Sequence, residues 1–230
     1  FGGNYSDELF GAALISDGSI LVAGFTRSSS ALSSEDILLA RLSADGDLLW
    51  AKRYGSSNES EYAWDLAAVG GDQFVLTGYA GSASQPTSAD AIIMLVDADG
   101  NVSWTQRSTY NGVDNGKAIA QSSDDKIIVT GSVQTGGSML EDAWIAKLDL
   151  TGQVLWSNTY SALENNNGSA LVATSDGGAL VTGQGIESNN SGVVASKAGS
   201  DGSISWSYRY NFISGNSPTH VLTTSGGDYL

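Results

Sequence analysis

Apolar and polar positions along the chain alternate in short runs that predict strands. Between residues 61 and 108 the apolar-rich runs are EYAWDLAAV, QFVLTGY, DAIIMLV and NVSWTQRS. Gly, Asp and Ser turns separate them, and no run keeps a helical period beyond one or two turns. Asp-Gly, the strongest short hairpin signal, recurs at 17–18, 45–46, 99–100, 176–177 and 201–202. The pattern therefore predicts antiparallel strands joined by tight turns.

The same pattern returns every 50 to 56 residues, in three columns that stay in phase along the whole chain. The first column is Trp50, Trp104, Trp156 and Trp206. The second is Gly24, Gly78, Gly131 and Gly183, and the third is Phe1, Tyr54, Tyr110, Tyr160 and Tyr210. We interpret these columns as four complete repeats and part of a fifth, with approximate bounds 1–53, 54–109, 110–159, 160–209 and 210–230.

Four antiparallel strands in about 50 residues are typical of a propeller blade. We therefore predict an all-β fold, a β-propeller built of four-stranded antiparallel blades, with residues 1–230 forming one propeller segment. Because a blade cannot bury both its faces alone, the repeated Trp is interpreted as an inter-blade anchor, with a sugar-stacking surface as the alternative. The repeats begin and stop in mid-blade, so we expect a fragment of a larger ring, with unpaired blade edges that allow self-association.

The repeats resemble those of bacterial and archaeal secreted or surface propeller proteins. The similar segments are DGSILVAGFT, DILLARLSADGDLLWAKRYGS and DAWIAKLDLTGQVLWSNTY. Asp149, Gly152 and Trp156 also resemble the tryptophan motif of pyrroloquinoline-quinone-type propellers. This resemblance implies a fold and names no activity, and the quinone enzymes use a vicinal Cys pair that this chain lacks.

Composition excludes several classes of function. The chain has 230 residues, no Cys, and ten Lys and Arg against 25 Asp and Glu, a net charge of −15. Nucleic acid is excluded as a partner because phosphate binding needs clustered cations. No run is long enough for a membrane span, and the first residues show no signal peptide. Acidity, the absence of Cys and the resemblance lead us to expect an exported bacterial protein, extracellular or at the cell surface.

The loops of unequal length all lie on one predicted rim. The connections between second and third strands and those between repeats are long and dissimilar, whereas the other turns are tight. In an up-and-down blade both long classes emerge on the same face. Variable loops on a rigid scaffold are the usual place for binding. We therefore expect a protein or a glycan to bind the long-loop face.

Two columns of acidic and amide residues map to the same rim. The first is Asp7, Glu61, Asp114, Asn166 and Asn216, and the second is Asp36, Asp90 and Asp142. Such side chains cap the backbone amides of loops. Their oxygens are also ligands for a hard cation, so a calcium site at Asp7, Glu61, Asp114, Asp36, Asp90 and Asp142 is the alternative. Both interpretations stay open.

Signs of catalysis are few. The sequence has no G-x-S-x-G elbow, no H-E-x-x-H and no phosphate loop. A catalytic acid should be unique rather than repeated once per blade, which leaves Asp65, Lys117, Glu187 and Glu35 as candidates, while His220 is expected to pack in the core or a channel. The leading hypothesis is a non-enzymatic extracellular scaffold for binding, adhesion or assembly. The alternatives are a carbohydrate-active or quinone-like propeller enzyme and a lectin-like binder.

Overall fold

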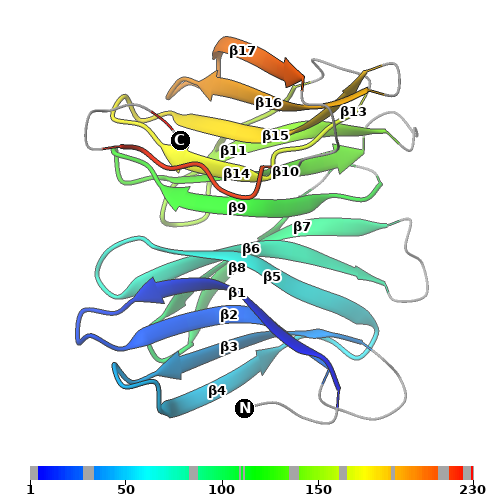
Figure 1. Ribbon diagram of the computed structural model, residues 1–230. Helices are drawn as coiled ribbons and strands as arrows, with labels where there is room; N and C mark the ends of the chain where they lie inside the picture. Colours follow the sequence, from blue (N-terminus) through cyan, green and yellow to red (C-terminus); the bar gives the residue numbers. More distant parts are fainter. Residues whose placement is uncertain are drawn as a thin grey trace. The chain divides into compact units, whose positions relative to one another are not determined.

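The structure is a computed structural model that contains strands and turns and no helix among the residues it describes (Figure 1). The described residues are 5–27, 34–82, 88–108, 110, 112–134, 140–160, 165–187, 190–211, 218–224 and 229. They form two compact units, Phe1–Gly116 and Lys117–Leu230, which we call unit 1 and unit 2. None of the described segments forms a helix that could cross a bilayer.

Unit 1 contains two four-stranded antiparallel sheets, each with its strands in chain order. The first sheet consists of β1 (Asp7–Leu14), β2 (Ile20–Thr26), β3 (Asp36–Leu42) and β4 (Leu48–Tyr54). The second consists of β5 (Glu59–Ala68), β6 (Gln73–Ser82), β7 (Ala89–Asp97) and β8 (Val102–Arg107). In Figure 1 the blue arrows of the first sheet run side by side in that order.

Unit 2 repeats this architecture, its first strand beginning two residues before the unit boundary. The third sheet consists of β9 (Asn115–Gln121), β10 (Ile127–Gln134), β11 (Glu141–Leu148) and β12 (Val154–Tyr160). The fourth consists of β13 (Asn165–Asn166), β14 (Ala170–Ala173), β15 (Ala179–Glu187), β16 (Asn190–Ala198) and β17 (Ile204–Asn211). β13 and β14 both pair with β15, so they are one first strand in two pieces. The predicted four-stranded antiparallel blades are therefore confirmed.

Burial follows the position of a strand in its sheet. The second strands β2, β6 and β10 are almost wholly buried, whereas the fourth strands β4 and β12 alternate between exposed and half-buried residues. Two pairs of adjacent apolar side chains are exposed where β4 and β12 begin, Leu48 with Leu49 and Val154 with Leu155. These edge strands carry apolar groups into solvent, and self-association through them stays a prediction.

The four repeated tryptophans occupy equivalent places. Each lies in the fourth strand of its sheet and pairs with the residue just before a register shift in the third strand. The pairs are Trp50 with Arg41, Trp104 with Leu95, Trp156 with Lys147, and Trp206 with Lys197. The sequence repeat is therefore also a structural repeat, residue by residue.

In unit 1 the fourth strand of the first sheet packs on a hairpin turn of the second. We call this contact, made by Trp50 and Tyr54, the Trp seat. The Tyr54 hydroxyl donates to the Gly100 carbonyl over 2.5 Å, and Lys52 Nζ donates to the Asp99 carbonyl over 2.5 Å. The Trp50 ring packs over Gly100, where a Cβ would come within 2.8 Å of a ring carbon. Trp50 and Tyr54 also pack against the buried cluster that includes Ile37, Phe74 and Met94. The Trp is therefore an anchor between two sheets, as predicted.

Unit 2 contains the same seat. Trp156 Nε1 donates to the Ser200 carbonyl over 2.9 Å, and the Tyr160 hydroxyl donates to the Gly202 carbonyl. Further along the chain, Trp206 packs with Val221, which belongs to the partial fifth repeat. Three fourth-strand Trp side chains thus pack on the segment that follows them in sequence order.

The second column consists of glycines inside the second strands, where another strand's backbone comes very close. The first strand bulges or breaks opposite these glycines, and its carbonyl oxygen is pushed toward them. A Cβ at Gly24, Gly78 or Gly183 would lie 1.9, 1.7 or 1.6 Å from that oxygen. Only glycine fits at this point of the repeat.

A repeated cation on the third strand was not anticipated from the sequence. Lys147, with a side chain only 2% exposed, donates from Nζ to Asp124 and to the Gly177 carbonyl, both over 2.8 Å. Arg41 and Lys197 make the corresponding ion pairs with Asp17 and Asp176, the aspartates of their own first turns. These pairs tie the first turn of a sheet to its third strand, and the paired charge offsets the cost of burying the cation.

The Trp seat predicts a difference between two glycine substitutions. Gly18 and Gly202 both have positive φ, 86° and 81°, but a Cβ at Gly18 meets nothing within 4 Å, whereas one at Gly202 lies 2.8 Å from Trp156. Gly18→Ala should cost about 1–2 kcal/mol for the backbone alone. Gly202→Ala should cost about 1–3 kcal/mol more, because the ring must move. Urea unfolding midpoints measure both, and equal losses would show that the seat contributes nothing.

Candidate functional site

The predicted acidic residues lie at one end of their sheets, because antiparallel first and third strands begin at the same end. β1 begins at Asp7 and β3 at Asp36, while Asp90 and Asp142 are second in β7 and β11. Glu61 lies in β5, Asp114 lies one residue before β9, and Asn166 ends the short strand β13. Asn216 lies outside the described residues. The long connections leave from the same end, so the predicted rim is present in each sheet.

Most of these acids are held by protein groups. Asp7 accepts from the Thr26 hydroxyl, and Asp114 accepts from the Ser108 hydroxyl over 2.6 Å. Asp36 lies 3.2 Å from Arg53 Nε, and Asp90 lies 3.5 Å from Arg107. Within the described part of the chain, no group of three or more Asp, Glu or His side chains is placed to hold a metal. The contacts favour local stabilisation, and calcium binding stays a prediction.

The capping interpretation predicts one melting temperature in calcium and in EGTA. If Asp7, Glu61, Asp114, Asp36, Asp90 and Asp142 act only through protein contacts, removing divalent cations changes nothing in the folded state. A calcium site would raise the melting temperature with ligand concentration, because it binds only the folded chain. Differential scanning fluorimetry in 5 mM Ca²⁺ and in EGTA distinguishes the two, and a calcium-dependent rise of several degrees would contradict capping alone.

Asp36 and Glu61 converge on Gly55, between the two sheets of unit 1. A Cβ at residue 55 would lie 2.2 Å from Asp36 Oδ1 and 2.9 Å from Glu61 Oε2. Glu61 is 4% exposed; its Oε1 accepts from the Ser56 amide over 3.0 Å, while its Oε2 has no hydrogen-bond partner among the described residues. Burial raises the pKa of Glu61 despite the Ser56 bonds, and burial raises the pKa of Asp36 despite Arg53. The folded chain therefore binds a proton at each of them more tightly than the unfolded chain does.

This pair predicts that Glu61→Gln stabilises the protein at neutral pH. A raised carboxyl pKa means that the folded state binds the proton more tightly, so its contribution to stability falls as pH rises from the ordinary value toward the raised one. Gln keeps the Ser56 bond and removes the charge. We expect the melting temperature at pH 7 to rise by about 2–4 °C per kcal/mol gained, and the gain to vanish below about pH 4.

Glu59→Gln is the matched control for this pH experiment. Glu59 bonds to Arg107 over 2.6 Å, and this hydrogen bond lowers the pKa of Glu59. Glu59→Gln should lower the melting temperature at pH 7 and have less effect in acid. The change at pH 7 is therefore opposite in sign to that of Glu61→Gln. If both variants shift the melting temperature in the same direction at pH 7, the proposed environment of Glu61 is wrong.

Glu35, one of the four non-repeated charged candidates, lies in a buried network beside this pair. Arg27 donates to Glu35 Oε1, the Ser60 hydroxyl donates to Oε2 over 2.7 Å, and the Tyr62 phenol also bonds to Glu35. Burial raises the pKa of Glu35, but these bonds outweigh it and leave the pKa below its usual range. Glu35 is therefore an ionised carboxylate that forms an ion pair with Arg27.

The other candidates are not brought to this network. Asp65 caps the Leu66 amide over 2.8 Å, and Lys117 lies in β9, where burial lowers its pKa. The side chain of Glu187 lies outside the described residues. His220 is exposed and contacts Thr219, so the expected core position is wrong.

Tyr62 joins the Glu35 network to a group of aromatic rings, which we call the aromatic cluster. Tyr62 and Trp64 stack with ring centroids 5.5 Å apart and planes 7° apart, and Phe10 lies 4.7 Å from Trp64. Phe25 and Tyr79 lie 4.7 and 5.2 Å from Tyr62. Phe10 is 44% exposed, so the cluster reaches the surface. It is built on β1, β2, β5 and β6, which hold it more firmly than loops would.

The sequence held a signal for the aromatic cluster that the search for charged residues missed. Three residues after each member of the first acidic column stand Phe10, Trp64, Lys117, Ser169 and Thr219. The column is aromatic only in the first two repeats. A functional residue is expected to differ between repeats, and this criterion, applied to aromatic residues, identifies Phe10 and Trp64.

Comparisons with known proteins leave the family open. No protein-family model matches the sequence, and no curated protein matches it. Among solved structures, the WD40 domain of Neurospora crassa Pan2 matches with a TM-score of 0.47 and 11% identity, covering 95% of this chain and 83% of that one. The blade architecture described above rests on the four sheets and their register.

Proposed function

We propose that this chain is a non-enzymatic binding scaffold, extracellular or at the cell surface, that holds a protein partner through the aromatic cluster and Arg27. The observation that carries the proposal is the chemistry of this surface. Aromatic rings and an arginine, built on rigid strands and reaching solvent, are the residue types that dominate protein-binding energy. Four-stranded blades supply the scaffold, since rigid sheets hold a surface in one geometry.

The ring geometry favours a protein over a glycan. A sugar stacks on the open face of an aromatic ring. Here Trp64 has Tyr62 on one side and Phe10 close by, so the rings largely cover one another. Phe10 and the Arg27 side chain are the most exposed, at 44% and 41%, whereas Tyr62, Trp64 and Tyr79 are half-buried. An apolar contact flanked by a guanidinium suits a protein surface better than a pyranose ring.

The carboxylates argue against glycoside hydrolysis at this place. A general acid must be protonated and must touch the glycosidic oxygen. Glu35 has a lowered pKa and is paired with Arg27, so it is not the proton donor. Glu61 has a raised pKa, but its open oxygen is buried and out of a substrate's reach. Neither carboxylate combines protonation with access.

The net charge of −15 suggests the kind of partner. A strongly acidic chain attracts basic surfaces over a Debye length and accelerates their encounter. We propose a partner with a basic surface, one apolar side chain of which packs against Phe10. The acidity, the absence of Cys and the repeat resemblance support export and a role in adhesion. Protease treatment of intact cells that express the natural gene tests whether the protein is exposed on the cell surface.

Peptide selection tests the surface itself. A phage-displayed peptide library selected on the immobilised chain should yield basic peptides with an aromatic or aliphatic anchor. Their affinity should fall tenfold or more in Phe10→Ala and Arg27→Ala, because truncating such an anchor costs about 2 kcal/mol or more and each tenfold loss is about 1.4 kcal/mol. Binding should also weaken as salt rises.

Leu14→Ala is the control for the peptide experiment. Leu14 lies on the same strand as Phe10 and is 72% exposed, but it belongs to no ring contact. Peptides that bind Phe10→Ala and Arg27→Ala as tightly as the natural chain would refute this surface. A glycan array signal lost in Trp64→Ala would favour the lectin-like alternative, and glycoside turnover lost in Asp36→Asn would favour an enzyme.

A further inference from the structure

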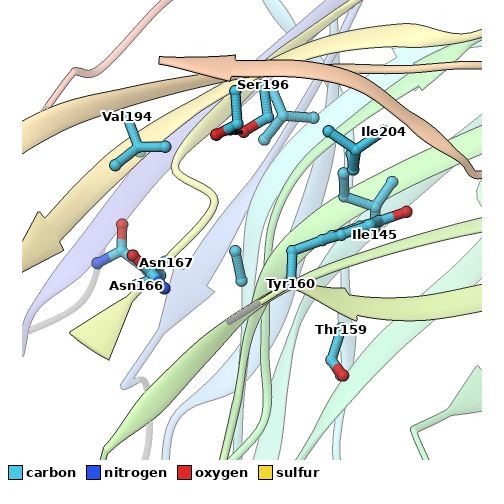
Figure 2. Close-up of a pocket in the computed structure, with 12 residues that line it drawn as sticks. Ile145, Thr159, Tyr160, Asn166, Asn167, Val194, Ser196 and Ile204 are labelled. Carbon is cyan, nitrogen blue, oxygen red and sulfur yellow. Dashed lines mark hydrogen bonds between the residues drawn. The ribbon is translucent and has the colours of Figure 1, made fainter. Parts of the chain in front are cut away.

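Unit 2 contains a cavity of about 330 Å³ between its two sheets. β11 and β12 form one wall, and β15, β16 and β17 form the other. Figure 2 shows Val194 and Asn166 at the left of the cavity and Ile145 and Ile204 at the right, so each of the two ends of the view contains residues of different strands. Its volume is in the range of pockets that hold small molecules.

The cavity exists because side chains that fill the same interface in unit 1 are replaced by smaller ones. Ala143 pairs with Tyr160 as Ile37 pairs with Tyr54, so the two residues are equivalent. Ser196 lies two residues after the partner of Gly183, as Met94 does after the partner of Gly78. Ile37 and Met94 are 1% and 6% exposed in the core of unit 1. Two large apolar groups are therefore missing from unit 2.

The backbone around the cavity has not closed over the missing volume. In unit 2 the Tyr160 hydroxyl makes the same bond to a turn carbonyl that Tyr54 makes in unit 1, and Trp156 adds a bond to the Ser200 carbonyl. Because these bonds set the sheet spacing, the walls cannot collapse onto each other. An unfilled apolar cavity costs stability in proportion to its volume. The equivalent positions of unit 1 show which side chains would fill the cavity of unit 2.

The lining selects an uncharged ligand. Ile145, Val181, Val194 and Ile204 supply apolar surface, and no Asp, Glu, Lys or Arg of the described segments lines the cavity. Ser196 and Ser207 supply neutral hydroxyls, 2.8 Å apart. A charged molecule would lose its hydration here without a counter-charge. Ser207 is exposed while Ile145 is buried, so a polar mouth leads to an apolar floor.

We infer that this cavity is a binding site for a small, uncharged and mainly apolar molecule with one hydroxyl group, of the size of a substituted phenol. The apolar body lies on Ile145 and Val181, and the hydroxyl bonds near Ser196 and Ser207. A cavity of about 150 Å³ holds benzene, so the larger volume admits a ring with substituents. The site lies in unit 2 and does not depend on the surface proposed in unit 1.

The test uses p-cresol as the probe and p-toluate as its charged counterpart. We expect p-cresol to raise the melting temperature of the chain in a concentration-dependent way, and p-toluate to have no effect. Ala143→Ile and Ser196→Met place the residues of unit 1 in the cavity. Each should raise the melting temperature without probe and weaken p-cresol binding tenfold or more in calorimetry.

Controls keep the cavity proposal falsifiable. Ser205→Met adds the same side chain to an exposed position of β17 outside the lining, and it should leave p-cresol binding unchanged. If a filled variant fails to fold, the milder Val181→Leu, which copies Leu76 of unit 1, replaces it. No binding of p-cresol at millimolar concentration, or equal binding in the filled variants, would overturn the proposal.

Discussion

The structure depends on the seating of the fourth strand of one sheet on a hairpin turn of its neighbour. A four-stranded sheet has two faces, and neither can be left in water, so each sheet needs the next. Trp50 and Tyr54 in unit 1, and Trp156 and Tyr160 in unit 2, meet this need with the same ring packing and the same hydroxyl-to-carbonyl bond. The spacing of the sheets follows from these contacts, and with it the room available for every side chain between them.

That fixed spacing explains why the two units differ in chemistry on one scaffold. In unit 1 the space between the sheets is filled by large groups such as Phe74 and Met94, and the aromatic cluster extends from it to the surface. In unit 2 smaller groups at equivalent positions leave a cavity. Since the seats hold the backbone in place, smaller side chains leave an open cavity between the sheets, and the sheets do not move closer to fill it.

Charge is arranged around the same constraint. The turns that receive the Trp side chains present carbonyl oxygens, and Arg41 on the third strand reaches one of them, the Ala98 carbonyl. Lys147 instead reaches the Gly177 carbonyl in the first turn of the next sheet, and both cations pair with an aspartate of their own first turn. The acidic residues at the opposite end bond to Ser, Thr and Arg side chains close by. Asp36 and Glu61 differ, because both converge on Gly55 and burial raises the pKa of each. The charge of Asp36 adds to the rise in the pKa of Glu61, and the charge of Glu35 adds to that of Asp36.

The sequence by itself determined the strands, the turns, the repeat and the role of the repeated Trp, because each depends on local preferences that recur with a fixed period. It also placed the acidic columns at one end of the sheets, since strand direction follows from the order of hairpins. Only the tertiary structure decided that Phe10 meets Trp64, that Glu35 pairs with Arg27, and that Ala143 and Ser196 leave a cavity. These depend on which side chains of different strands share the space between two sheets, and a one-dimensional pattern does not contain those volumes.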